Sequence, residues 1–437
     1  MSKLSTRESI GYCFGDVGSN LTNTFANIFL LIFYTDVFGI SPAQAATLFL
    51  VARIWDAIND PIVGYFVDRT NTKNGRFKPY IGIAALPVAL FGVAMFTVPD
   101  LGPDAKLVYA YVTYIGYGMV YSLMSVPYIS MISALSEDSK ARTKLVGIRS
   151  ALVMLFSATM AGIPALVDLL GGGDPAVGYQ RTMMVYASVG FLMHVYCYRS
   201  VTEHIQVAGN DQEERVSFKQ VVSYLGQNKP LLILFALFFA VFGNSFITTS
   251  SGIYLLTYLF EAKDIFPLFV VCQLLCIVFG VLLSRKLVDK YDPKWIFVAG
   301  ALLAATRTIA VYSGDLNTFL AFVPHSSLGQ GFMVGVIWGF VPDAIEYGRQ
   351  KTGLNIVGIG NSLIGFFLKC GAAVGGIVPG FMLEIYNYVP NAAQSEETLI
   401  GIKHMSGTFP LAILVVVALI ASAYPLTQKK LKEVIVA

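Results

Sequence analysis

Long apolar segments, one after another, constrain this chain more than any other feature of its sequence. About 20 consecutive apolar residues are enough for a helix to cross the hydrocarbon core of a bilayer. Twelve segments of the sequence meet this length, with approximate bounds 12–38, 43–67, 79–98, 107–134, 146–170, 182–200, 231–259, 265–287, 295–313, 318–342, 355–384 and 405–426. We therefore predict an all-α membrane protein with twelve transmembrane helices.

The composition agrees with lipid as the main solvent of the chain. Only 13% of the 437 residues are charged, against about 25% in soluble proteins. The N-terminal MSKLSTRESIGY is too polar for a signal peptide, so we expect the first apolar segment to be retained. The net charge of +3 gives no reason to expect nucleic acid as a partner. No GxxxxGK[ST] motif is present and the longest polar loop is short, so we expect neither an enzyme nor a cofactor.

The chain divides into two similar parts around a polar connector. We predict six-helix bundles at 1–200 and 231–437, joined by a cytoplasmic middle loop at 201–230. The loop GYFVDRTNTKNGRFKPY is echoed by GVLLSRKLVDKYDPKW about 217 residues later. Of the 30 Lys and Arg residues, 23 fall on the side that holds both termini and four on the other. The positive-inside rule then predicts that both termini are cytoplasmic.

The second apolar segment, FLVARIWDAINDPIVGYF, carries charges that lipid would not tolerate. Arg53, Asp56 and Asp60 are spaced along one helical face, with Asn59 at its edge. Each charge at mid-bilayer costs about 2.5–3.5 kcal/mol, so these residues are expected to face a polar cavity. Carboxylate, amide and hydroxyl oxygens suit Na⁺, and carboxylates also take up H⁺. We predict a cation site of Asp56, Asn59, Asp60 and Ser122, with both aspartates as metal ligands if the ion is Na⁺. The alternative is an Arg53–Asp ion pair that only fixes packing.

Three further residues in the second half have two interpretations each. Lys369 lies near the middle of its segment, too deep to snorkel easily, so we expect it to face the cavity. Arg307 lies nearer the outer end of its segment, where snorkelling to the interface is an equal alternative. Trp338 has the ring needed to stack on a sugar face, with helix packing as an equal alternative.

Several segments resemble the glycoside–pentoside–hexuronide:cation symporters, the group of melibiose permease and the glucuronide carriers. The similar segments are FYTDVFGI, FLVARIWDAINDPIVG, DRTNTKNGRFKPY, YSLMSVPY, PDAIEYGRQKTG, FFLKCGAAVGG and YPLTQKKLKE, which together extend over essentially the whole chain. The resemblance implies the major facilitator fold, with two pseudo-symmetric six-helix halves and a substrate held between them. It also implies a multi-pass protein of a bacterial inner membrane.

The resemblance also assigns roles to individual residues. In the family, paired acids of the second helix carry the coupling cation, and these match Asp56 and Asp60. Asn59 matches a position linked to Na⁺ use, and Ser122 falls where a hydroxyl ligand is found. The substrate-binding set implied here is Asp16, Asn20, Arg53, Ser125, Arg149, Trp338 and Lys369. The set that resembles an ion-pair gate is Arg142, Arg285, Asp343, Glu346 and Arg349, and Asp36 is also assigned to gating.

The sequence departs from the family pattern at two sugar-binding positions. Asn20 and Ser125 stand where melibiose permease has aspartates. Loss of negative charge beside Arg149 and Lys369 suits an anionic sugar, while Asp16 either compensates in the cavity or is structural. We expect a monomeric symporter that takes up a hexuronide or β-glycoside, with neutral pentosides next, coupled to Na⁺ or H⁺. A multidrug or metabolite exporter of the same fold is the alternative.

Overall fold

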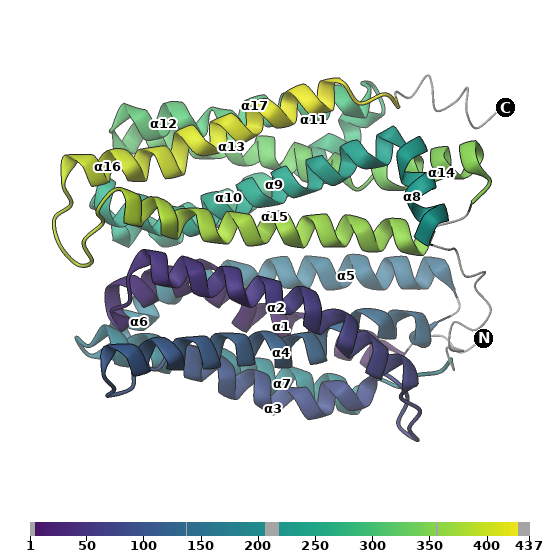
Figure 1. The fold of residues 1–437 in the computed structure, drawn as a ribbon, viewed down its shortest axis with the longest axis horizontal. Helices are drawn as coiled ribbons and strands as arrows, with labels where there is room; N and C mark the ends of the chain where they lie inside the picture. The colour runs from purple at the N-terminus through teal and green to yellow at the C-terminus, as the bar shows by residue number, and fades with distance from the viewer. Residues whose placement is uncertain (1–4, 137, 206–217, 355–356, 427–437) are drawn as a thin grey trace. The chain divides into compact units, whose positions relative to one another are not determined.

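The computed structural model describes residues 5–136, 138–205, 218–354 and 357–426. Every secondary-structure element in these ranges is a helix, as Figure 1 shows. The chain forms two compact units, Met1–Glu213 and Glu214–Ala437. The division between them falls inside the polar connector of the sequence.

The helices follow one another with short connections. Those of the first unit are α1 (Thr6–Phe33), α2 (Pro42–Arg69), α3 (Lys78–Met95), α4 (Pro103–Leu135), α5 (Ser139–Ser157) continued by α6 (Ile163–Gly171), and α7 (Pro175–Ser200). Those of the second unit are α8 (Phe218–Gln227), α9 (Lys229–Tyr254), α10 (Phe266–Val288), α11 (Pro293–Ala305) continued by α12 (Arg307–Ser313), α13 (Leu316–Ile337) followed by α14 (Phe340–Thr352), α15 (Val357–Ile385), and α16 (Glu396–Lys403) leading into α17 (Phe409–Ser422).

The same helix pairings occur in both units. In the first unit α1 packs against α5 and α7, α2 against α4, and α3 against α4 and α7. In the second unit α9 packs against α15 and α17, α10 against α13, and α11 against α13 and α17. When the six long helices of each unit are taken in chain order, these two sets of pairings are identical. The expected pseudo-symmetry of the halves is therefore present in their packing.

A short π-helical segment adds to this correspondence. It extends the first long helix of each unit, at Tyr34–Phe38 after α1 and at Leu255–Leu259 after α9. The two segments start 255 − 34 = 221 residues apart, close to the offset between the similar loops. Local backbone geometry thus repeats along with the sequence.

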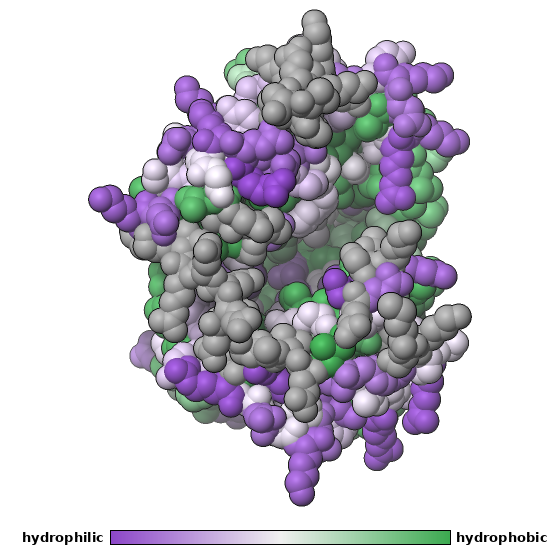
Figure 2. Space-filling model, turned by 90° about the vertical axis from the view of Figure 1, so that its right-hand side faces the viewer, coloured by the Kyte–Doolittle hydropathy of each residue, from purple (hydrophilic) through white to green (hydrophobic). Residues whose placement is uncertain are grey.

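Length and apolar composition agree with helices that cross a membrane. In the part of the chain that the structure describes, ten helical segments are long and apolar enough to do so. The two other long helices, α2 and α7, have 28 and 26 residues but more polar ones, including Arg53 and Asp56 on α2. Large apolar side chains cover the helix surfaces, such as Leu90, Phe279 and Leu419 at 60%, 60% and 64% exposure. Hydrophilic residues instead gather on the end face seen in Figure 2.

Several helices extend beyond the apolar segments that predicted them. α1 begins at Thr6 rather than near residue 12, because Ser5 and Glu8 form a capping box there. α7 begins at Pro175 rather than near 182, where Asp174 accepts hydrogen bonds from two backbone N–H groups. The last span begins at Glu396 rather than near 405, and Ser395 caps it. Hydropathy locates the part of a helix in lipid, whereas caps set its ends.

Two other features differ from the predictions. The middle loop contains a helix, α8, which a polar connector did not predict. Arg307 does not reach an interface, because its side chain is buried at 4% exposure inside the second unit. Its Nη2 lies 3.5 Å from the Thr248 carbonyl oxygen, and its guanidinium lies 5.8 and 6.0 Å from the rings of Phe269 and Phe319. The snorkelling interpretation is therefore wrong.

Glycines allow the close contacts of α13. A Cβ added at Gly329 would lie 2.4 Å from the Gly300 carbonyl oxygen of α11. One at Gly331 would lie 2.3 Å from the Ile277 carbonyl oxygen of α10. Small residues let membrane helices approach closely, so the GQG pattern serves helix packing.

Candidate functional site

The charged face of α2 lies half-exposed within the first unit. Arg53 Nη1 is 3.5 Å from Asp56 Oδ2, and the two side chains are 33% and 27% exposed. Asp60 is half-buried one turn further along the helix. Asn59 is only 7% exposed, and its Nδ2 has no hydrogen-bond partner among the described residues. The nitrogen and oxygen of an amide exchange places by rotation, so Asn59 can present an oxygen at this buried position.

The backbone of α4 lies directly against the Asp56 carboxylate. A Cβ added at Gly118 would be 2.7 Å from Asp56 Oδ1. Any residue other than glycine at this position would therefore displace the Asp56 carboxylate. Ser122 follows one turn later on α4 and is buried at 5% exposure. Pro61 inside α2 has no N–H, so the Ala57 carbonyl one turn earlier loses its helical donor. The Asp56 carboxylate thus lies in the contact between α2 and α4.

Two tyrosines of α4, Tyr114 and Tyr121, lie near these charges, and sequence reasoning missed them. Tyr114 is within electrostatic range of Arg53 and Asp56. Tyr121 stacks on Tyr117 with ring centroids 5.8 Å apart. The signal was present in YIGYGMVYS, because positions 114, 117 and 121 are spaced to lie on one helical face. Tyr114 and Tyr121 thus add phenols near the charges of α2, whereas the Tyr117 hydroxyl forms a hydrogen bond with Thr22 Oγ1 of α1 at 2.9 Å.

A second polar group joins α1 to α5. Arg149 Nε lies 3.2 Å from Asp16 Oδ2, as a charge pair whose angle is not that of a hydrogen bond. Arg149 Nη1 donates to the Tyr12 hydroxyl at 3.4 Å. Asn20 Nδ2 donates to Asp16 Oδ1 at 3.1 Å. Tyr12 is held in place by its stacking on Tyr128, at 4.8 Å between ring centroids.

This pair bears on the two interpretations of Asp16 that the sequence left open, compensation in the cavity and a structural role. The neutral Asn20 and Ser125 stand where melibiose permease has aspartates. Asp16, one helical turn before Asn20, places a carboxylate beside Arg149. The positive charge of Arg149 is therefore compensated inside its own unit and does not by itself favour an anionic sugar.

Tyr121 lies near both polar groups. Its hydroxyl is within electrostatic range of Asp16 on α1 and of Arg53 and Asp60 on α2. Ser125 is half-buried one turn beyond it on α4. The structure thus brings the predicted cation residues and the first-half sugar residues into one region of the first unit.

The remaining predicted substrate residues belong to the second unit. Lys369 is exposed on α15. Trp338, between α13 and α14, is 49% exposed and packs edge-on against Phe238 at 4.8 Å between ring centroids. Trp338 therefore has both a packing contact and an open face.

The predicted gate residues are divided between the two units. Arg349 donates to both carboxylate oxygens of Glu346 on α14, at 2.9 and 2.8 Å. Asp343 precedes this pair on the same helix, and Arg285 is exposed near the end of α10. Arg142 Nη1 donates to the Ser136 carbonyl at 2.7 Å in the first unit.

Asp36 is at a different end of the first unit. It lies in the π-helical segment after α1 and accepts from Thr35 Oγ1 at 2.6 Å. Arg142 lies at the start of α5, after α1, α2, α3 and α4 have alternated in direction. Asp36 and Arg142 are therefore at opposite ends of the unit and cannot share one gate.

Comparison with known proteins identifies the family of this chain. The family model described as MFS/sugar transport protein matches residues 11–428. An uncharacterized symporter of Bacillus subtilis, YnaJ, is 33% identical over 100% of this chain and 95% of its own length. A glucuronide carrier protein homolog of Escherichia coli is 32% identical over 99% and 95% of the two chains.

Solved structures show the same fold at low sequence identity. A D-xylose–proton symporter has a TM-score of 0.69 at 14% identity, over 97% of this chain and 98% of that one. Because the family model matches nearly the whole sequence, the resemblance seen in its motifs is confirmed. This chain belongs to the MFS/sugar transport family, with the glycoside–pentoside–hexuronide:cation symporters as its group, and is a membrane transporter rather than an enzyme.

Proposed function

We propose that the chain is a secondary active symporter that takes up a sugar together with a cation by alternating access. The two carboxylates of α2, Asp56 and Asp60, are the observation that supports this proposal. Both are half-buried and lie one helical turn apart on α2. The Asp56 carboxylate lies against the backbone of α4 at Gly118, and its Oδ2 is 3.5 Å from Arg53 Nη1. Carboxylates placed in this way inside a membrane transporter can bind Na⁺ or take up a proton.

We propose Na⁺ as the first candidate for that partner. A proton needs only a carboxylate, whereas Na⁺ needs several hard oxygen ligands. Asn59 and Ser122 are neutral oxygen-bearing residues buried beside the two aspartates, and a proton carrier has no use for them. Proton coupling through the same aspartates is the alternative, and direct measurement separates the two ions.

We propose Asp16, Asn20 and Arg149 as the sugar-binding group of the first unit. A carboxylate and a guanidinium held 3.2 Å apart offer charge-assisted hydrogen bonds to neighbouring sugar hydroxyls. Relatives of this chain are named for glucuronide, sulfoquinovose and isoprimeverose. A glycoside or hexuronide is the proposed substrate, with Lys369 of the second unit as the candidate partner for an acidic substituent.

The proposed mechanism follows from the cost of buried charge. Cation binding neutralises the aspartates of α2, and this lowers the cost of closing a dry cavity around them. Sugar binding then favours the closed and inward-open states over the outward-open one. We propose that the protein works as a monomer in a bacterial inner membrane, with both termini in the cytoplasm.

Uptake measurements with purified protein in liposomes test the proposal. A panel of labelled neutral glycosides and glucuronides is offered under an inward Na⁺ gradient, an inward proton gradient, or neither. We expect accumulation of at least one sugar only with one of the gradients. Equal distribution of every sugar under all three conditions contradicts cation-coupled uptake.

Export is the second candidate function. One relative, 28% identical over 98% of this chain, is named a putative 2,3-dihydroxypropane-1-sulfonate exporter. The charged face of α2 favours cation-driven uptake over it. Expression in intact cells that lack other carriers separates the two, because an importer raises and an exporter lowers the internal level of its substrate.

A further inference from the structure

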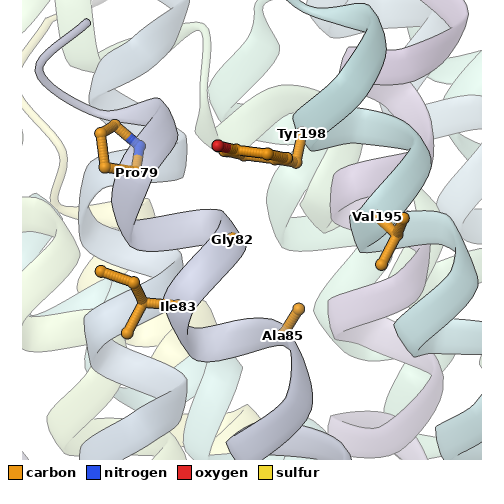
Figure 3. Close-up of a pocket in the computed structure, with 6 residues that line it drawn as sticks. All are labelled: Pro79, Gly82, Ile83, Ala85, Val195 and Tyr198. Carbon is orange, nitrogen blue, oxygen red and sulfur yellow. The ribbon is translucent and has the colours of Figure 1, made fainter. Parts of the chain in front are cut away.

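A groove between α3 and α7 is separate from the candidate transport site. It has a volume of about 340 Å³ and is lined by Pro79, Gly82, Ile83, Ala85, Val195 and Tyr198. Figure 3 shows Tyr198 extending from α7 toward Pro79 on α3. A Cβ at Gly82 would lie 3.0 Å from two carbons of the Tyr198 ring, so the glycine lets this ring lie close over α3.

The groove opens onto the apolar surface of the first unit. Ile83 is 66% exposed at its edge, and Leu192, one turn before Val195 on α7, is 64% exposed. In a chain that crosses a membrane, such a surface meets lipid. Apart from the Tyr198 hydroxyl, the lining side chains are hydrocarbon, so an acyl chain is the matching occupant.

Positive charge lies at one end of the groove. Lys78 stands one helical turn before Gly82, and its Nζ is 5.2 Å from the centre of the Tyr198 ring. Arg199 is exposed one turn after Val195. Within the described ranges neither side chain forms an ion pair. Glu203, the nearby acid, already accepts hydrogen bonds from three consecutive backbone N–H groups, those of residues 76–78.

We propose that the α3–α7 groove binds one acyl chain of an anionic phospholipid, with the headgroup phosphate beside Lys78 and Arg199. Charge complementarity selects the class of lipid, because basic residues near a bilayer surface attract anionic headgroups. The groove then fixes where on the protein that lipid sits. Phosphatidylglycerol is a suitable probe of this class.

Binding to the purified, delipidated protein in detergent tests the proposal. Thermal unfolding is followed while phosphatidylglycerol, phosphatidylcholine or glycerol phosphate is titrated in. We expect phosphatidylglycerol to raise the unfolding temperature at the lowest concentration and glycerol phosphate to have no effect. Lys78→Gln and Arg199→Gln should each weaken phosphatidylglycerol binding about fivefold. Lys73→Gln, an exposed lysine of the preceding loop, is the matched control and should not.

A second pair of variants tests the place of the acyl chain. Val195→Phe fills the groove and should abolish the effect of phosphatidylglycerol, whereas Leu192→Phe on the same helix should retain it. Equal stabilisation by phosphatidylcholine, or by glycerol phosphate alone, overturns the proposal. So does unchanged lipid binding by both charge variants, an outcome that is measurable even if Val195→Phe does not fold.

Discussion

Replacing Gly118 by alanine perturbs the proposed cation site through a single added methyl group. The new Cβ would stand 2.7 Å from Asp56 Oδ1, whereas ordinary contacts begin near 3.4 Å. The carboxylate oxygen must therefore retreat by about 0.7 Å, the difference between these two distances. No charge is removed, so the variant tests the position of the carboxylate and not its presence.

The expected loss of cation-binding free energy follows from the small tolerance of ion–ligand distances. Distances from a metal ion to its ligands hold to within about 0.2 Å. A carboxylate oxygen displaced by more than this therefore binds the cation more weakly. A cost of about 1–2 kcal/mol is typical of such local strain. That range corresponds to a fivefold to thirtyfold change in an equilibrium constant. We expect the half-saturating cation concentration to rise about tenfold, with little change in maximal uptake.

The assay is sugar uptake into liposomes as a function of the coupling-ion concentration. Gly64→Ala on α2 is the matched control, because a Cβ there would have nothing within 4 Å. Any effect of alanine on helix propensity appears in both variants. If Gly118→Ala and Gly64→Ala show the same cation affinity as the unaltered protein, the Asp56 carboxylate does not bind the ion in the position seen here.

Other substitutions test separate parts of the structure. Asp60→Asn should abolish accumulation against a gradient while leaving energy-independent sugar exchange, and full uphill transport by this variant would exclude a coupling role. Asp16→Asn leaves Arg149 uncompensated, so uptake of a neutral glycoside should fall about tenfold more than uptake of a glucuronide. Adding Arg149→Gln should remove that preference, and strictly additive effects of the two substitutions would show that the pair is not coupled. Glu203→Gln replaces charge-assisted hydrogen bonds to three backbone N–H groups by weaker ones, at a cost of about 1–3 kcal/mol. Thermal unfolding should show a lower midpoint, and an unchanged midpoint would mean that this contact does not stabilise the fold.

The fold was largely predictable because lipid imposes a simple rule. A backbone in hydrocarbon must satisfy its own hydrogen bonds, and a helix does so within one segment. The lengths of the apolar segments were therefore enough to predict where the long helices lie, without information on the helices that pack against them. Their ends were less predictable, since polar caps such as Ser5 and Asp174 lie outside the apolar runs. The helix α8 was missed for the same reason, because a short helix in a polar loop gives no signal of this kind.

In the candidate site, features within one helix were predictable from the sequence, whereas contacts between helices were not. Spacing along one helix is fixed by helix geometry, so the sequence alone aligned Arg53, Asp56 and Asp60 on one face of α2. Only the tertiary structure placed Gly118 against Asp56 and paired Arg149 with Asp16. These contacts join different helices, and hydropathy carries no information on which face of one helix meets which face of another. Side-chain packing and the pairing of buried charges determine which helix faces meet. They therefore also determine which charged side chains neutralise one another.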